Sequence, residues 1–250
     1  MVKISALVVV HNEENQIKSC LESLVFADEL VVILDNCNDG SKDIIKKFTK
    51  KYYVGDWPIE GDRRNFGISK CSNDWILEID ADERVSNELK DEILNVINES
   101  KYDWHQIEVN NFIKKKLIRY GWGSYFGKSA YAGLFRKGVK VWGRQRVHPK
   151  IELSGKRGKN LKNRLTHYYC SDISDLLKKL DSYSNARALD LKHENSNESL
   201  LKNIRRIFSR FWKCFFLRKG FREGKFGFLI AIVACLYPLI SYLKFKEKMK

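Results

Sequence analysis

Two aspartates separated by one residue, Asp80 and Asp82, are the side chains in this sequence best suited to chemistry. They follow the apolar run 75–79, which predicts a buried strand that ends where the carboxylates begin. Residues two apart on a strand share a face, so both carboxylates could reach one ion or one sugar phosphate. Mg²⁺ and Mn²⁺ prefer such oxygen ligands and often bridge to substrate phosphates. The alternative is a turn that carries two solvated acids.

The residues that must position these aspartates alternate between strand and helix patterns. Apolar runs at 4–10, 30–34, 52–54 and 75–79 predict strands, and helices are expected at 17–26, 42–50 and 61–70. This order predicts an α/β fold with a doubly wound, mostly parallel sheet. Ligands of such sheets bind beyond the carboxyl ends of the strands, so the polar loops 11–15, 35–41 and 80–83 should line one edge. No Gly-x-Gly-x-x-Gly or phosphate-loop motif follows the first strand, which argues against a dinucleotide dehydrogenase or a P-loop enzyme.

Charge divides the chain into two unlike parts. Residues 1–100 carry 12 Lys and Arg against 20 Asp and Glu, whereas residues 101–250 carry 34 against 11. The acidic part suits a metal-using domain, and the basic part suits a partner that is anionic. None of the six cysteines forms a Cys-x-x-Cys pair, which fits a reducing cytosol. The apolar run at the start is too short for the core of a signal peptide, so secretion is not expected.

The last quarter of the chain predicts helices that meet a membrane. Residues 173–191 have the spacing of an amphipathic helix, and residues 204–222 interleave apolar side chains with Lys and Arg, as interfacial helices do. The apolar stretch 226–240 is interrupted by Gly227 and Pro238, which favours a re-entrant or interface-embedded segment over a span. A core helix packed on the catalytic domain is the alternative. We expect a domain at 1–170, with halves at 1–100 and 101–170, and a helical extension at 171–250.

Several of these pieces together resemble a known family. Residues 4–14, residues 30–40, Arg64-Asn65 and Asp80-Ala81-Asp82-Glu83 are similar to the corresponding parts of family 2 glycosyltransferases of the GT-A fold. Within that family the sequence most resembles the lipopolysaccharide-core β-1,4-glucosyltransferase branch, and the likeness covers most of the chain. It implies an inverting, metal-dependent transferase that moves a hexose such as glucose from a UDP-sugar to a lipopolysaccharide-core, lipid-linked or other cell-envelope acceptor. The basic amphipathic run 204–222 and the apolar run after it predict a peripheral location on the inner face of the cytoplasmic membrane, at an anionic surface.

The resemblance assigns roles to individual residues. It implies that Asn12 and Glu13 cradle the nucleotide, Asp35 accepts the uracil N3–H, Arg64 lies near the ribose or diphosphate, Asp80 faces the ribose and Asp82 binds Mg²⁺ or Mn²⁺. Three of these residues have simpler alternatives. Asp35 could cap a helix, Arg64 could be a surface partner of Asp62, and Glu13 could merely favour a helix N-terminus.

The identity of the general base is open. Inversion needs a group that takes the proton of the acceptor hydroxyl. The resembled branch often has Glu directly after the His, where this sequence has Pro149, and it usually has Arg where this sequence has Gly133. His148 is the nearest replacement, Glu152 is the next, and His148 could also be an ordinary hydrogen-bonded histidine. His167 is a possible third metal ligand.

Two other functions remain as alternatives. A metal-dependent nucleotidyltransferase also uses paired aspartates, although it usually has a Gly-rich basic loop after the first strand. Nucleic-acid binding is suggested by net charge alone, and the acidic first part argues against it. The aromatic stretch 120–126 suits either sugar stacking or ordinary packing.

Overall fold

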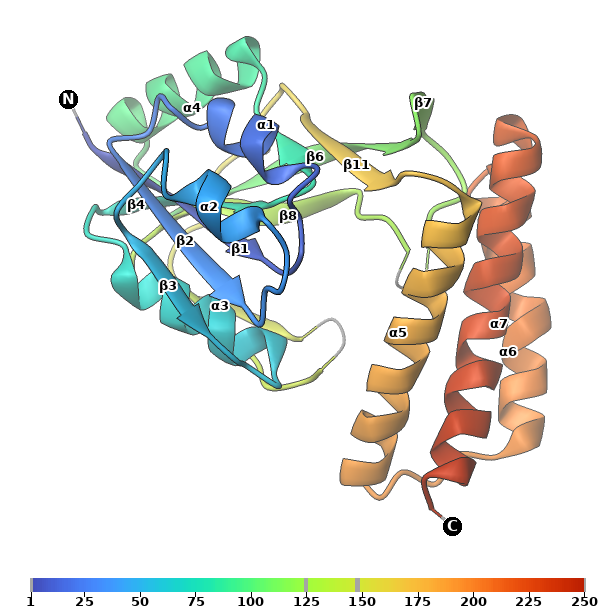
Figure 1. Cartoon of the computed structure of the whole chain (residues 1–250). Helices are drawn as coiled ribbons and strands as arrows, with labels where there is room; N and C mark the ends of the chain where they lie inside the picture. Colours follow the sequence, from blue (N-terminus) through green and yellow to red (C-terminus); the bar gives the residue numbers. More distant parts are fainter. Residues whose placement is uncertain (1, 124–125, 147–148, 250) are drawn as a thin grey trace. The chain divides into compact units, whose positions relative to one another are not determined.

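The computed structural model describes residues 2–123, 126–146 and 149–249, and it divides into two compact units (Figure 1). Unit 1 contains Met1–Val109, Ala130–Gln145 and Pro149–His167. Unit 2 contains Asn110–Ser129 and Tyr168–Lys250, together with Arg146. Residues 110–129, which the sequence analysis assigned to the first domain, therefore lie in the unit that holds the C-terminal helices.

Unit 1 is built on a curled sheet with the strand order β3-β2-β1-β4-β8-β6-β11-β5. The first four positions in that order are parallel, and β8 pairs antiparallel with β4 and with β6. The prediction of a doubly wound, mostly parallel sheet is confirmed. The strands that lie wholly in unit 1 are β1 (Ile4–Val10), β2 (Glu29–Asp35), β3 (Tyr52–Gly55), β4 (Trp75–Asp80), β5 (Glu83–Arg84) and β8 (Ala130–Arg136). Two strands, β6 (Trp104–Ile113) and β11 (Leu165–Cys170), begin in unit 1 and end in unit 2. β7 (Lys116–Ile118) lies in unit 2, where it pairs with the end of β6.

Helices cover both faces of this sheet. One face is covered by three helices: α1 (Ile17–Glu22), α2 (Ser41–Ile45) and α4 (Asn87–Glu99). They pack on every second side chain of β1 and β4, the set that includes Val8 and Leu77. On the other face, α3 (Glu60–Lys70) packs near Leu7, Ile33 and Ile76. Figure 1 shows α3 on the opposite side of the sheet from the other three helices. Every residue of β1 is buried, as expected of a central strand covered on both faces.

Two of the helices in unit 1 are shorter than predicted. α1 ends at Glu22 instead of residue 26, and the chain continues in tighter turns, in which the backbone N–H groups of Leu24 and Ala27 donate to the carbonyl oxygens three residues earlier. α2 ends at Ile45 instead of residue 50. α4 has a defined start, since the Ser86 hydroxyl accepts from the backbone N–H of Leu89 at 3.2 Å.

A small two-stranded antiparallel sheet lies beside α3. Its strands are β9 (Lys140–Trp142) and β10 (Ile151–Leu153). The Asn65 side chain of α3 accepts from the backbone N–H of Trp142 at 2.9 Å and donates to its carbonyl oxygen at 2.8 Å. Gly61 allows this approach, because a Cβ there would lie 1.8 Å from the carbonyl oxygen of Gly143.

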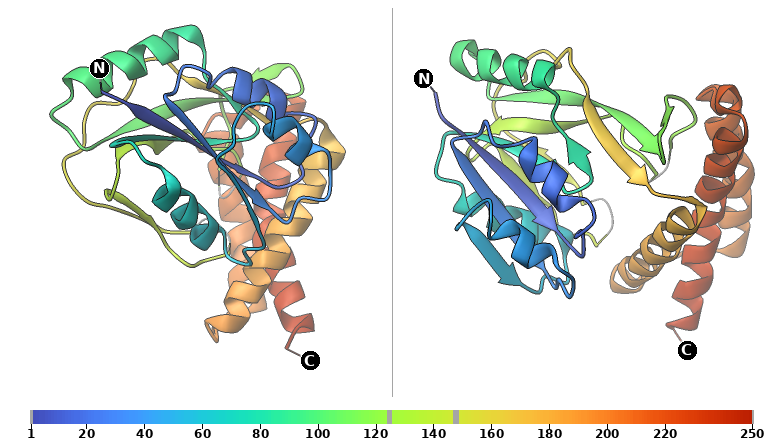
Figure 2. Two further views of the ribbon diagram at one scale, coloured as in Figure 1. Left: turned by 60° about the vertical axis from the view of Figure 1, so that its left-hand side comes forward. Right: turned by 45° about the horizontal axis from the view of Figure 1, so that its top comes forward.

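Unit 2 is a helical unit with its own apolar core. Its helices are α5 (Ile173–His193), α6 (Leu200–Trp212), a π-helical segment (Lys213–Leu217), a 3₁₀ turn (Gly220–Glu223) and α7 (Lys225–Glu247). α7 packs against both α5 and α6, and Figure 2 shows α6 and α7 side by side along their lengths. Phe126, Tyr183 and Tyr237 join this core through ring contacts about 6.0 Å apart.

Gly227 and Pro238, which interrupt the apolar stretch in the sequence, do not interrupt the helix: α7 continues through both, and ten of its residues are buried. A proline removes one helical hydrogen bond, but Pro238 is buried and α7 packs on α5 and α6, so tertiary packing offsets that loss. Among the described residues, α7 is the one helix with the length and apolar composition to cross a membrane. Half of its most apolar window is buried inside the protein.

Candidate functional site

The three polar loops of the prediction lie at one edge of the sheet. β2, β1 and β4 are adjacent and parallel, and their registers pair Val10 with Leu34 and Val9 with Asp80. The strands therefore end side by side, and the loops that begin after Val10, Asp35 and Asp80 emerge together. This is the edge at which α/β sheets bind ligands.

The loops after β1 and β2 are bonded to each other. The Asn12 side chain accepts from the backbone N–H of Asn38 at 2.7 Å, and the Glu13 N–H donates to the Ser41 hydroxyl at 3.0 Å. Asn12 and Asn36 both have positive φ, of 54° and 47°, a conformation that Asn tolerates better than most residues. These contacts hold the two predicted nucleotide-cradling residues against the loop that follows Asp35.

Asp35 ends β2 and is almost completely buried. One carboxylate oxygen accepts from the backbone N–H of Trp57 at 2.9 Å, and the other forms an ion pair with Arg63. The helix-cap alternative for Asp35 is wrong, because Gly40 occupies the N-cap position of α2. The Nε of Arg63 is buried and has no hydrogen-bond partner among the described residues. A buried donor without a partner is unfavourable, which makes Arg63 a candidate for bonding a ligand next to Asp35.

Arg64 is buried at the centre of an acidic cluster. Its guanidinium donates to Glu60, Glu78 and Asp80, each at 2.9 Å. Burial alone would lower the pKa of Arg64, but the charges of Asp80, Glu60 and Glu78 raise that pKa well above its ordinary value. The surface-partner alternative is wrong, because Asp62 pairs with Arg144 instead. Arg64 thus holds the Asp80 carboxylate in a fixed position.

A second buried cation completes this network. Lys140 on β9 has no exposed side-chain surface, and its Nζ lies 2.7 Å from a carboxylate oxygen of Glu78 and 2.8 Å from the carbonyl oxygen of Ala132. The Trp142 ring lies over both cations, 4.7 Å from the Arg64 guanidinium carbon and 4.4 Å from the Lys140 Nζ. Burial alone would raise the pKa of Glu78, but Lys140 and Arg64 keep it below its ordinary value.

Asp82 pairs with His167, which β11 brings to it. β11 runs antiparallel to β5, with His167 opposite Glu83, and the Nε2 of His167 lies 3.1 Å from a carboxylate oxygen of Asp82. Both side chains are largely buried. Glu83 braces the turn between the two aspartates, because its carboxylate accepts from the Asp80 N–H at 2.9 Å and lies 3.0 Å from the Tyr131 hydroxyl.

The pair formed by Asp82 and His167 has the chemistry of a partial metal site. Carboxylate oxygen and imidazole nitrogen are both metal ligands, and Mg²⁺ is often held by one or two carboxylates plus substrate phosphates. Within residues 2–123, 126–146 and 149–249, no group of three or more His, Cys, Asp or Glu is arranged to hold a metal alone. The two side chains therefore fit an ion that a diphosphate helps to bind.

The two candidate bases stand differently in the structure. His148 lies outside the described residues. Glu152 is on β10, where it is exposed and pairs with Val141 of β9. Trp122 and Phe126, from the aromatic stretch, pack within unit 2, with the Trp122 ring 5.1 Å from Tyr169 and Phe126 fully buried.

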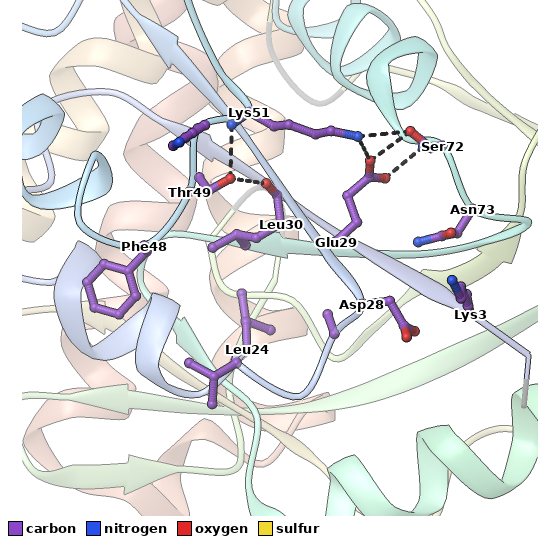
Figure 3. Close-up of a pocket in the computed structure, with 13 residues that line it drawn as sticks. Lys3, Leu24, Asp28, Glu29, Leu30, Phe48, Thr49, Lys51, Ser72 and Asn73 are labelled. Carbon is purple, nitrogen blue, oxygen red and sulfur yellow. Dashed lines mark hydrogen bonds and ion pairs between the residues drawn. The ribbon is translucent and has the colours of Figure 1, made fainter.

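A hollow of about 610 Å³ lies at the opposite edge of the sheet, where β1 and β2 begin (Figure 3). Glu29 lies in its wall and accepts hydrogen bonds from Lys51, Ser5 and Ser72. Burial alone would raise the pKa of Glu29, but these bonds lower it from 4.5 to about 2. The Glu29 carboxylate is already bonded to groups of the protein near the starts of β1 and β2. This hollow is therefore not the expected donor site.

Sequence reasoning passed over three residues of the site: Arg63, Glu78 and Lys140. Glu78 could have been found, because an acid inside an otherwise apolar strand requires a buried cation as a partner. The partner itself could not, since Lys140 lies 62 positions away and only the fold joins them.

Comparisons with known proteins identify the family of this chain. Residues 5–180 match the model of glycosyl transferase family 2, and the chain belongs to that family. An uncharacterized glycosyltransferase of Rickettsia conorii is 27% identical over 98% of this chain and 90% of its own length. The lipopolysaccharide core biosynthesis glycosyltransferase LpsC of Rhizobium meliloti is 24% identical over 98% of this chain and 92% of its own. A solved structure of S. aureus TarS 1-349 in complex with UDP covers 98% of this chain and 88% of its own, at 15% identity and a TM-score of 0.49. The protein is thus a glycosyltransferase with the predicted fold.

Proposed function

We propose that this glycosyltransferase moves a hexose such as glucose from a UDP-sugar to a lipopolysaccharide-core or other cell-envelope glycan, with inversion at the sugar carbon. The observation that carries the proposal is that Asp35 ends β2, Asp80 ends β4 and Asp82 follows it, at one edge of the sheet on either side of β1, in a member of family 2. One displacement step would convert an α-linked donor into a β-linked product.

The nucleotide is proposed to bind between the first two loops. Asp35 would accept the uracil N3–H, and the orphan Nε of Arg63 would donate to a uracil carbonyl oxygen or to the ribose. Asn12 and Glu13 would border the nucleotide. Arg64 holds Asp80, which would face the ribose hydroxyls. Carboxylates suit this task because they accept hydrogen bonds from both N–H and O–H groups.

Asp82 and His167 would hold Mg²⁺ or Mn²⁺ against the diphosphate. A bound cation stabilises the charge that develops on the leaving diphosphate. The protein's own part is to fix the two ligands, which the pairing of β5 with β11 does. His148 is the proposed general base and Glu152 the second choice, because each could take the acceptor proton.

The acceptor is proposed to be lipid-linked, so that the enzyme works at the inner face of the cytoplasmic membrane. The likeness to LpsC, a lipopolysaccharide core biosynthesis glycosyltransferase, supports the acceptor class. The basic and apolar surface of α6 in unit 2 supports the location.

The proposal is tested by donor binding and transfer in the presence and absence of metal. UDP-glucose with Mn²⁺ should raise the melting temperature, since a ligand that binds the native state stabilises it by mass action. Asp82→Asn should remove the Mn²⁺-dependent part of that rise and lower transfer by roughly a hundredfold or more. Asp91→Asn, which removes an equal charge from the exposed face of α4, is the matched control. Full transfer by Asp82→Asn would contradict the metal role, and no melting shift with any UDP-sugar would contradict the donor class.

A further inference from the structure

α6 carries a row of large apolar side chains that its own unit does not cover. Leu201, Ile204, Phe208 and Trp212 are 79%, 39%, 72% and 57% exposed. Their spacings of three and four residues place them on one face of the helix. We call this row the α6 stripe; from its first to its last residue it extends along about 16 Å of helix.

The core of unit 2 does not use the α6 stripe. α6 packs on α7 through other positions: Asn203 is buried, and Phe211 lies 6.0 Å from the Phe228 ring of α7. Cys214, in the π-helical segment, is also buried in this core. The helix therefore keeps one apolar face for its own packing and leaves a second one open to a partner.

The exposed apolar surface continues past the end of α6. The rings of Trp212 and Phe216 lie 4.5 Å apart, so the π-helical segment prolongs the α6 stripe. Leu217 and Phe221, in the turn that leads to α7, are also exposed. A contiguous apolar surface of this kind marks an interaction site in a protein.

The exposed charges of α6 and of the turn after it are positive, and Glu198, directly before α6, is largely buried in an ion pair with Arg206. Between residues 199 and 246 the sequence has one acid, Glu223, and that side chain is buried, where it accepts from the backbone N–H groups of Arg119 and Tyr120. The exposed cations on α6 and the turn after it are Lys202, Arg205, Lys213, Arg218, Lys219 and Arg222. Successive residues of an α-helix are about 100° apart around its axis, which places Arg205 directly beside the α6 stripe. An exposed surface whose side chains are apolar and mainly cationic complements a sheet of lipid phosphates.

We infer that the α6 stripe docks on an anionic lipid bilayer, with α6 lying in the plane of the interface and the flanking cations at the lipid phosphates. This deepens the membrane location in the proposed function and rests on that function only for its biological purpose. α7 acts as a support helix in this arrangement, since ten of its residues are buried within the protein.

The test is co-flotation of the full chain with vesicles of phosphatidylglycerol and phosphatidylcholine, compared with vesicles of phosphatidylcholine alone. Binding should require the anionic lipid and weaken as salt is added. Phe208→Ser/Trp212→Ser should lower the apparent affinity roughly tenfold or more, because binding scales with the apolar area inserted. The matched control is Ile173→Ser/Leu177→Ser on α5, where the side chains are 51% and 50% exposed. This control variant should bind the anionic vesicles as tightly as the unaltered chain does.

A second pair of variants tests the cations. Arg205→Gln/Lys213→Gln should lower the affinity about thirtyfold at low salt, from the usual worth of two cations near an anionic surface. Lys178→Gln/Lys192→Gln removes the same charge from exposed positions on α5 and should have much less effect. Equal losses in both pairs would mean that net charge alone drives binding, which would overturn the docking surface.

Two further results would overturn the inference. One is the absence of any flotation of the unaltered chain with phosphatidylglycerol vesicles. The other is a dimer in sedimentation velocity that Phe208→Ser/Trp212→Ser turns into a monomer with vesicle binding unchanged, which would assign the α6 stripe to a second copy of the chain. The vesicle assay needs neither donor nor metal, so Asp82→Asn should float normally. Failure of the donor proposal is therefore distinguishable from failure of this one.

Discussion

Replacement of Lys140 by Met tests whether the buried network beneath Asp80 is held by ion pairing. Met keeps much of the volume of the lysine stem but removes the Nζ, which lies 2.7 Å from Glu78 and 2.8 Å from the carbonyl oxygen of Ala132. Breaking a buried pair by removing one partner costs about 3–5 kcal/mol. Glu78 keeps a bond to Arg64 at 2.9 Å, so we expect a loss near the lower limit, about 3 kcal/mol.

The measurement is urea unfolding at pH 7, supported by the melting temperature. For a chain of this size, about 3 kcal/mol corresponds to a fall of roughly 6–12 °C. Glu78→Gln/Lys140→Met should recover part of the loss, because the double variant no longer buries a carboxylate that has lost one of its two cations. A Lys140→Met variant within about 1 kcal/mol of the unaltered protein would refute this account.

The pH dependence of the same network has a definite sign. The pKa of Glu78 is lowered in the folded protein by Lys140 and Arg64, in opposition to burial. The stability it contributes is therefore present above the unfolded pKa, about 4.3, and is lost as the pH falls through the lower folded value. Since Lys140→Met removes part of that lowering, the deficit of the variant should shrink below about pH 4.

Two further predictions concern unit 1. Glu29→Gln should lower the free energy of unfolding by about 2 kcal/mol at pH 7, a value discounted because Lys51 is half exposed. The difference in urea midpoint between the variant and the unaltered protein should close as the pH falls from 4.5 towards 2. A difference that stays constant with pH would contradict the lowered pKa of Glu29. Gly61→Ala should destabilise the protein by at least about 1–3 kcal/mol in urea unfolding, since its Cβ would lie 1.8 Å from the Gly143 carbonyl oxygen, and unchanged stability would show that α3 and β9 can separate at little cost.

The sequence determined the class of fold and the edge at which the site forms. A central strand of a parallel sheet is buried on both faces and therefore needs a nearly continuous apolar run, such as 4–10 or 75–79. β1 is buried throughout. The same runs predicted that Asp35 and Asp80 end strands. Both were expected at one edge of the sheet, because parallel strands end at the same edge. Family 2 membership could be inferred from the same residues and is confirmed.

Helix limits were less predictable, for local and for tertiary reasons. After Glu22, α1 gives way to turns with i→i+3 bonds, a local change that apolar spacing does not reveal. α7 continues through Pro238, which is buried in a helix that packs on α5 and α6, and periodicity and proline rules cannot anticipate that packing. Local preferences cost a few kcal/mol at most, so packing of this extent can override them.

Only the tertiary structure decided which charges meet. His167 reaches Asp82 because β11 pairs with β5, and Lys140 of β9 meets Glu78 of β4 only in the folded chain. Sequence shows which side chains carry charge and which strand ends in a carboxylate. It does not show partners that are 62 or 85 positions apart, since their contact depends on the folding of everything between them. The ion pairs around the site are therefore decided by the tertiary arrangement of the strands, whereas the positions of the carboxylates along the strands can be read from the sequence.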